Sequence, residues 1–180
     1  MQSLATLSGS DLVWQKRNWR RQAFDLYAGN DVIATVSWEN WQQTKAIAEI
    51  GNKFLRFERQ GFWRSRDVVS AVELGETVAV FERNSWGYGG TLTWSNGRCA
   101  EFKGKRQGWW TMQWTWYIDN EPLLHFNSKY SWVETKDQVD IVAANLLPDD
   151  IALLLTFGWY LLMKKTANET NAALAGAAGG

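Results

Sequence analysis

Basic residues stand next to aromatic residues in three stretches of this 180-residue sequence. Arginine and lysine side chains bind phosphate groups, and tryptophan rings settle at the boundary between lipid and water. The three stretches therefore predict binding of a lipid head group or another anion. The alternative is that they are solvated strand edges and turns, where cations prevent edge-to-edge pairing. The candidate residues are Lys16, Arg17, Arg20, Arg21, Arg56, Arg59, Arg64, Arg66, Lys103, Lys105 and Arg106, with Trp19, Phe62, Trp63, Trp109 and Trp110 beside them.

Residue types that commonly perform catalysis are few and isolated in this chain. His125 stands among apolar residues, and a catalytic triad or metal site needs partners that the sequence does not identify. Cys99, the only cysteine, follows the Asn96-Gly97 turn and is expected to be a small buried residue rather than a nucleophile. We therefore expect no catalytic residues, no metal site and no cofactor, and a protein that is not an enzyme.

The composition is that of one globular domain with no net charge. Nineteen basic and nineteen acidic residues cancel, so the net charge gives no argument for nucleic acid or an anionic surface, although it permits a local basic patch. With a single cysteine no internal disulfide can form, and the first twenty residues lack the apolar run of a secretory signal. We expect an N-terminal tail over residues 1–11, then a cytoplasmic domain over 12–165, peripheral at a membrane if it binds lipid.

Most of the chain, from about residue 12 to residue 144, reads as short β-strands. Apolar and polar residues alternate along 32–38 and 111–118, which indicates strands with one buried face. Turn residues such as Gly51-Asn52 and Asn96-Gly97 separate the segments, and thirteen tryptophans suit pleated, half-buried surfaces. This spacing predicts an up-and-down antiparallel sandwich or barrel of about twelve strands. The other expected segments are 22–27, 45–50, 53–58, 67–73, 77–83, 90–94, 99–103, 123–128 and 138–144.

A different pattern begins at Pro148. Proline at a first helical position, acids just after it and the bases Lys164 and Lys165 in a last turn predict a helix over residues 148–165. Residues 151–163 between them are apolar on every side, so the helix is buried in protein or in a membrane. Their rise of about 20 Å is short of the ~30 Å hydrocarbon core, which favours burial in protein. Residues 166–180 are expected to be a disordered tail.

The order of these elements resembles a known superfamily. The segments that carry the resemblance are the hairpins 24–38 and 114–127 and the ending Leu146-Leu-Pro-Asp-Asp-Ile-Ala-Leu-Leu-Leu, within residues 12–165. Strands followed by one apolar helix are similar to the tubby C-terminal-like superfamily, which includes the LURP-one-related proteins and the phospholipid scramblases. The resemblance implies a roughly twelve-stranded antiparallel barrel closed around its C-terminal helix, and association with phospholipid head groups. The chain lacks a cysteine-rich palmitoylation segment and an acidic calcium loop.

A helix inside the barrel leaves the outer surface for function. The sequence thus predicts a non-enzymatic domain that binds phospholipid head groups, a membrane surface or a protein through its outer face. The alternative is a carbohydrate-binding β module in which exposed tryptophans stack on sugars. Sugar binding would be favoured if Trp63, Trp86, Trp109 and Trp110 lined an open face. Lipid binding would be favoured if the tryptophans packed on the helix and basic residues gathered outside.

Overall fold

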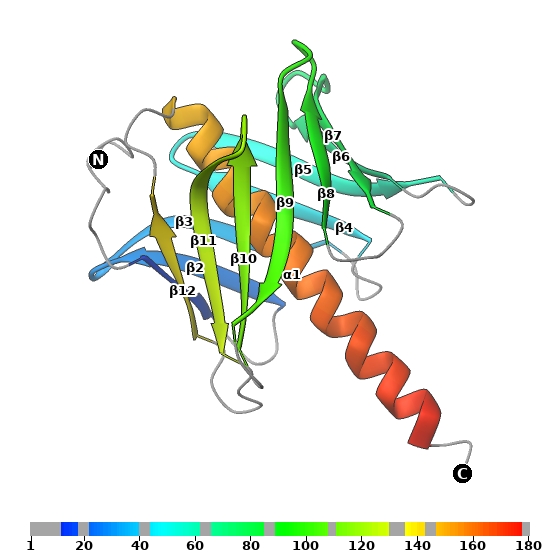
Figure 1. The fold of residues 1–180 in the computed structure, drawn as a ribbon. Coiled ribbons are helices and arrows are strands. Elements are labelled where there is room, and N and C mark those ends of the chain that lie inside the picture. The colour runs from blue at the N-terminus through cyan, green and yellow to red at the C-terminus, as the bar shows by residue number, and fades with distance from the viewer. Residues whose placement is uncertain are drawn as a thin grey trace.

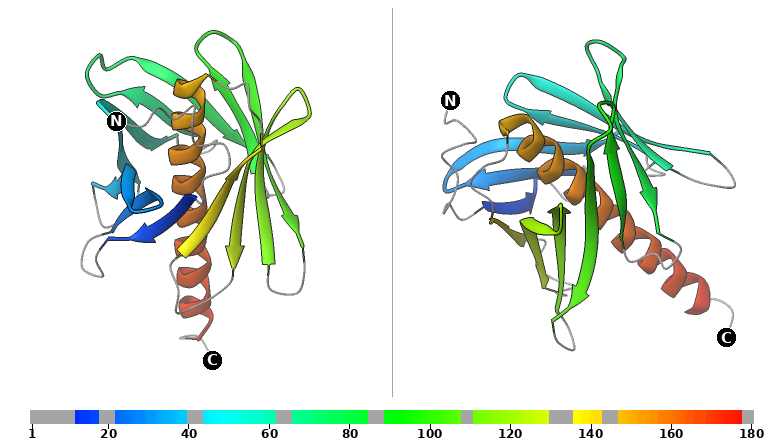
Figure 2. Two further views of the ribbon diagram at one scale, coloured as in Figure 1. Left: turned by 90° about the vertical axis from the view of Figure 1, so that its left-hand side faces the viewer. Right: turned by 45° about the horizontal axis from the view of Figure 1, so that its top comes forward.

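The computed structural model is a closed antiparallel barrel of twelve strands around one long helix, over the residues that it describes (Figures 1 and 2). These residues are 12–17, 22–39, 44–61, 66–84, 89–107, 111–129, 136–142 and 147–177. Neighbouring strands follow the chain order, and β1 closes the barrel against β12. The fold predicted from the sequence is therefore confirmed. The strands are β1 (Leu12–Lys16), β2 (Ala23–Ala28), β3 (Asp31–Trp38), β4 (Lys45–Ile50), β5 (Lys53–Gln60), β6 (Arg66–Ala71), β7 (Thr77–Arg83), β8 (Gly89–Trp94), β9 (Cys99–Arg106), β10 (Thr111–Ile118), β11 (Glu121–Lys129) and β12 (Lys136–Ile141), followed by α1 (Pro148–Ala177).

The first strand, β1, is the one that the alternation pattern did not single out. Leu12 and Trp14 face the interior and are fully buried, but the intervening Val13 is also apolar, so the expected alternation is weak. Pairing of Leu12 with Val139 and of Trp14 with Asp137 joins the two ends of the sheet. This pairing removes both sheet edges, which would otherwise expose unpaired backbone groups.

Aromatic side chains from the strands pack on the helix and form the core. Trp14 stacks on Trp159 with ring centroids 5.2 Å apart, and Phe57 meets Phe157 edge-on at the same distance. The indole N–H of Trp116 donates to the Leu154 carbonyl at 3.0 Å. The tryptophan-rich strands thus act as a lining that matches an apolar helix, as their alternation predicted.

Gly158 lets the helix approach the barrel wall. A Cβ at this position would lie 2.6 Å from the ring of Phe126 and 2.7 Å from the indole nitrogen of Trp116. Contacts this short do not occur between real Cβ atoms and aromatic rings, so any larger residue would displace two buried rings. The packing of the helix against Phe126 and Trp116 therefore depends on the absence of a side chain at this position.

The helix begins at Pro148, as predicted, but continues to Ala177. The predicted end at Lys165 and the predicted disordered tail are wrong for residues 166–177, which are helical. The end of the helix contains several alanines, and alanine is the best helix former. Adding turns to an existing packed helix also costs little free energy compared with starting a new one. The final turns project beyond the strands (Figure 1), and residues 1–11 and 178–180 lie outside the described part of the chain. No helix among the described residues is long and apolar enough to cross a bilayer.

Candidate functional site

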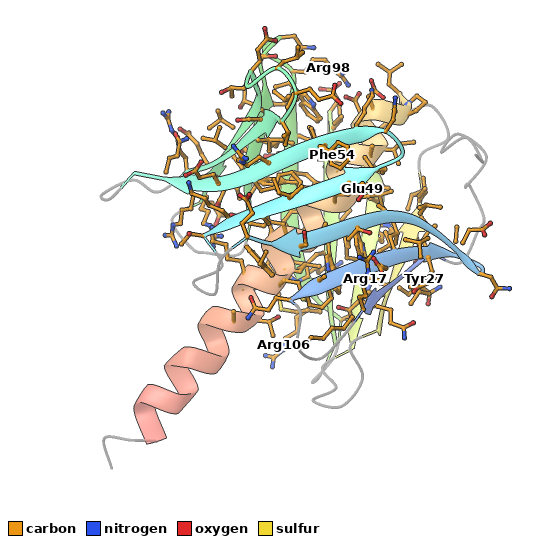
Figure 3. All side chains as sticks on the ribbon, turned by 180° about the vertical axis from the view of Figure 1, so that it is seen from behind. Arg17, Tyr27, Glu49, Phe54, Arg98 and Arg106 are labelled. Carbon is orange, nitrogen blue, oxygen red and sulfur yellow. The ribbon has the colours of Figure 1, made fainter. Side chains whose placement is uncertain are left out.

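In an up-and-down barrel alternate strand connections lie at the same end, so each end is formed by its own set of connections. Odd-numbered strands end, and even-numbered strands begin, at the end from which α1 leaves, which we name the exit end. The helix starts at the opposite end, named the turn end, where short connections such as Gly51-Asn52 close the hairpins (Figure 1). Among the residues labelled in Figure 3, Arg106 lies near the exit end and Arg98 near the turn end.

At the turn end, two separate ion pairs hold the start of the helix. The Lys53 ammonium lies 2.6 Å from the Asp149 carboxylate, and both side chains are exposed. The Arg98 guanidinium donates to Asp150 at 2.8 Å and lies over the Trp94 ring. Because acids in the first turn also complement the helix dipole, this end is electrically balanced around the helix.

At the exit end, the helix is held by a buried hydrogen-bonded network. Asp67 on β6 is 1% exposed and accepts hydrogen bonds from the Tyr160 hydroxyl at 2.9 Å and from the Lys164 ammonium. Lys164 also donates to the Tyr160 oxygen at 2.9 Å. The Arg83 guanidinium lies 3.4 Å from the second Asp67 oxygen. A carboxylate from the wall therefore fixes two helix side chains that stand one turn apart.

Strand register explains why these residues meet. Asp67 pairs with Arg59 on β5 and with Phe81 on β7, and all three belong to the inward-facing rows of their strands. Arg83 is two residues beyond the buried Phe81 and so shares its inward face. Tyr160 and Lys164 on the helix lie at the same height along the barrel as Asp67. We name this set of five residues, Arg59, Asp67, Arg83, Tyr160 and Lys164, the mouth cluster.

The mouth cluster contains three cations and one carboxylate, and its pKa values reflect this. Burial lowers the pKa of Lys164 to about 8; the Asp67 carboxylate opposes that shift, and the Arg83 and Arg59 charges add to it. Burial, followed by the charge of Asp67, raises the pKa of the Tyr160 hydroxyl above its usual range. The tyrosine is thus a permanent neutral donor, and the lysine is the group that titrates near neutral pH.

Charge along the whole barrel is separated between the two ends, although the net charge is zero. Within two residues of the described strand ends, and on the helix where it starts and leaves, acidic residues dominate the turn end and basic residues the exit end. At the turn end the acids are Asp31, Glu49, Glu73, Glu76, Glu101, Asp119, Glu121, Asp140, Asp149 and Asp150, with Lys53 and Arg98 as the bases. At the exit end, among residues whose side chains the structure describes, the bases are Lys16, Arg17, Lys45, Arg59, Arg66, Arg83, Lys105, Arg106, Lys164 and Lys165, with Asp25, Glu39, Glu58, Asp67, Glu82 and Asp137 as the acids.

The basic residues singled out from the sequence surround the exit end instead of forming one patch. Their three stretches flank the connections β1–β2, β5–β6 and β9–β10, which lie four strands apart around the barrel. Lys16, Arg59, Arg66, Lys105 and Arg106 occupy strand ends there. Three candidates have outward partners on the wall: Arg17 with Asp25, Arg56 with Glu39, and Lys103 with Glu101. Arg20, Arg21 and Arg64 lie outside the described residues.

Four members of the mouth cluster were missed from the sequence: Asp67, Arg83, Tyr160 and Lys164. Lys164 was interpreted as a last-turn base, but the helix continues past it and the side chain is buried against Asp67. One signal was available, because Asp67 interrupts the inward row of a strand that is otherwise apolar. Its partner is 97 residues away, and no local pattern identifies it.

His125 and Cys99, the residues considered for catalysis, both lie on the outer face of the barrel wall. His125 accepts from or donates to Thr115 at 2.8 Å on the outer wall, and no group of three potential metal ligands is found among the described residues. Cys99 is exposed, so its predicted burial is wrong. The reason is strand direction: Ala100 and Phe102 take the inward positions of β9, which places Cys99 on the outward face.

The described tryptophans pack inward. Trp14, Trp94, Trp114, Trp116 and Trp159 are buried, and Trp38 packs against the core with its ring 5.1 Å from Tyr160. None of them offers an open stacking platform for a sugar. The carbohydrate alternative depends on Trp63, Trp86, Trp109 and Trp110, and all four lie outside the described residues.

Comparison of the chain with protein-family models, with curated proteins and with solved structures finds no match in any of the three. The resemblance to the tubby C-terminal-like superfamily therefore stays a prediction based on element order. What the barrel itself contributes is a closed wall, a filled interior and two ends of opposite charge.

Proposed function

We propose that this barrel is a non-enzymatic, tubby-like domain that associates with phospholipid head groups at a membrane surface through its exit end. The observation that carries the proposal is the separation of charge between the two ends. A neutral protein with one basic end is attracted to an anionic surface in one orientation and repelled in the opposite one. Each lysine or arginine near an anionic leaflet contributes about 1 kcal/mol.

The sequences that connect strands at the exit end support the same surface. Each of the six connecting sequences there contains tryptophan, whereas the connections at the turn end contain none. Tryptophan is enriched at membrane–water interfaces because its ring is apolar and its N–H is polar. The residues are Trp19, Trp41, Trp63, Trp86, Trp109, Trp110 and Trp132.

The projecting helix limits how the barrel can approach a membrane. Residues 166–177 rise about 18 Å at 1.5 Å per residue and leave from the exit end. A flat surface therefore contacts one side of the basic rim, with the barrel tilted so that the helix lies beside the contact. The filled interior leaves lipid extraction into the barrel unsupported, which favours head-group contact over transport.

Sedimentation with lipid vesicles tests the proposal. The full-length protein is mixed with neutral phosphatidylcholine vesicles and with vesicles that also carry phosphatidylserine or a phosphoinositide, at two salt concentrations. We expect co-sedimentation with anionic vesicles only, and weaker binding at high salt, because screening shortens the range of surface charges. Absence of binding to every anionic composition at low salt would refute the proposal.

A further inference from the structure

The large apolar side chains that are exposed in the described part of the chain lie at the turn end. There are six of them, and each stands in or beside a connection at that end. Exposed apolar residues that are scattered singly need no explanation, whereas a group on one part of the surface marks an interaction site. The six are Val32, Phe54, Val72, Leu74, Val142 and Leu147.

Three of the six lie together on β5 and in the turn after β6. The backbone N–H of Val72 donates to the Phe54 carbonyl at 3.0 Å, so these two residues stand opposite each other. The inward positions are taken by Phe57 and Val69, which places Phe54 and Val72 on the outer face of the wall. Leu74 follows in the same turn and is 72% exposed, the highest value of the six. We name Phe54, Val72 and Leu74 the apolar patch.

The turn that carries Leu74 is closed by its own backbone. The N–H of Gly75 donates to the Ala71 carbonyl at 2.8 Å, and the N–H of Ala71 donates to the Glu76 carbonyl at 2.9 Å. A side chain on a hydrogen-bonded turn loses little backbone entropy when a partner covers it. The exposed leucine is therefore held ready for contact.

Acidic side chains lie beside the apolar patch. Glu73 and Glu76 flank Leu74 in the same turn, are exposed, and form no salt bridge with a residue that the structure describes. Glu49 is also exposed and stands opposite Phe54 across β4 and β5 (Figure 3). The patch is thus bordered by carboxylates on two sides.

Two cations near this surface already have acidic partners of their own. The Lys53 ammonium lies 2.6 Å from Asp149 at the start of the helix. The charge of Arg17 reaches Glu49, but its guanidinium donates to Asp25 at 2.6 and 2.7 Å. The surface therefore combines exposed apolar side chains with a negative potential.

This combination decides which kind of partner fits. Anionic lipids and nucleic acids are repelled by an acidic surface, so the apolar patch is not a membrane anchor. A second copy of the chain offers a basic exit end, but the helix projects about 18 Å beyond the strands there and prevents two ends from meeting face to face. A protein segment that carries lysine or arginine beside apolar side chains complements both features.

We infer that the apolar patch is a docking surface for a basic, amphipathic segment of a partner protein. The apolar side chains of the patch supply the buried area, and the three glutamates attract the cations of the segment and set its orientation. The inference goes beyond the proposed function and does not depend on it. A barrel held at a membrane by its exit end directs the turn end, and with it the apolar patch, toward the aqueous phase.

The first experiment measures binding of a fluorescent synthetic peptide to the full-length protein by anisotropy, without lipid. The peptide is an amphipathic helix of leucine and lysine, and two analogues replace lysine with glutamate or leucine with serine. We expect the leucine–lysine peptide to bind, and each analogue to bind about tenfold more weakly or worse. Higher salt should weaken binding. No binding of the leucine–lysine peptide at low salt, or equal binding of either analogue, would overturn the inference.

Substitutions in the patch locate the binding. Leu74→Ser removes the most exposed apolar side chain and should weaken binding about fivefold or more, and Phe54→Ser should act in the same direction. Glu73→Gln with Glu76→Gln should weaken binding at low salt and reduce its salt dependence. Leu74 and both glutamates are exposed, so their variants should keep the Tm of the wild-type protein.

Matched controls lie at the same end on the far side of the barrel. Val142→Ser removes an exposed apolar side chain beside β12, and Asp119→Asn with Glu121→Gln removes two exposed acids from the connection between β10 and β11. These variants should bind the peptide as the wild-type protein does. Equal losses in controls and patch variants, or wild-type binding in every variant, would overturn the inference.

Sedimentation equilibrium tests the other occupant, a second copy. We expect the wild-type protein to stay monomeric at the concentrations used for peptide binding. Self-association that Leu74→Ser abolishes would assign the patch to a second copy and overturn the inference of a basic partner protein. Leu74→Ser should bind anionic vesicles as the wild-type protein does, because the patch and the exit end lie at opposite ends of the barrel. The vesicle result and the peptide result therefore test the two proposals separately.

Discussion

The two ends of α1 are held by opposite kinds of electrostatic contact. At the turn end, Lys53–Asp149 and Arg98–Asp150 are separate, solvent-reached pairs in which each cation meets one acid. At the exit end, one buried carboxylate serves two cations, Lys164 and Arg83, and the hydroxyl of Tyr160. The first arrangement needs nothing further, whereas the second is incomplete in charge. Such departures from local satisfaction are common at functional sites, so the difference points to the exit end.

The largest effect is expected at Gly158, where both ends depend on the same packed segment. Gly158→Arg places a charge without a partner between Phe126 and Trp116 and should unfold the domain. Gly158→Ala is the milder test: one methyl group should lower the free energy of unfolding by about 1–3 kcal/mol despite its better helix propensity. Urea unfolding measures both. A folded arginine variant would contradict the close helix-to-wall contact.

Breaking the exit-end network should cost more than breaking any pair at the turn end. Asp67→Asn leaves Lys164 buried beside two arginines without its counter-charge, and we expect a loss of about 3–5 kcal/mol in the free energy of unfolding. The double variant Asp67→Asn with Lys164→Met removes the stranded charge and should recover part of the loss. A loss under 1 kcal/mol in the single variant would show that the network does not hold the helix.

The pH dependence of stability should reveal Lys164. Its pKa is 10.5 in the reference state and about 8 in the fold, where Asp67, Arg83, Arg59 and Tyr160 surround it. Between these values the unfolded chain binds a proton that the folded protein has released, so the free energy of unfolding rises with pH. Compared with Lys164→Met, the wild-type protein should gain about 1 kcal/mol per pH unit from pH 8 to 9.5.

This window stops below pH 10 for a physical reason. Tyr160 has a raised pKa, so at higher pH the unfolded tyrosine ionises while the folded one does not, and stability then falls. Chemical unfolding at half-unit steps of pH gives the comparison. Parallel curves for wild type and Lys164→Met would show that the lysine is not desolvated in the fold.

The smallest effect is expected at the turn end. Lys53→Gln removes an ion pair whose two side chains are both exposed, so the free energy of unfolding should change by less than about 1 kcal/mol. The change should shrink further in high salt. If this variant is as damaging as Asp67→Asn, the contrast between the two ends is wrong.

Local patterns in the sequence determined the elements, and long-range register determined the site. Alternation found most strands, and Pro148 with its acids found the start of α1. The contact between Asp67 and Lys164 could not be predicted from the sequence. It depends on closure of the barrel through β1 and on the position of the helix along the barrel. The charge separation between the ends could have been predicted, because alternate connections of a meander lie at one end and their charges can be counted separately. The net charge of zero for the whole chain does not reveal this separation.

The central claim is that the exit end, and not the barrel as a whole, meets an anionic partner. The direct test compares two double variants with the same change in charge: Arg59→Gln with Arg106→Gln at the exit end, and Lys53→Gln with Arg98→Gln at the turn end. Sedimentation with phosphoinositide vesicles is measured at low salt. We predict at least about tenfold weaker binding for the exit-end variant and wild-type binding for the turn-end variant. Equal losses in both would contradict the account.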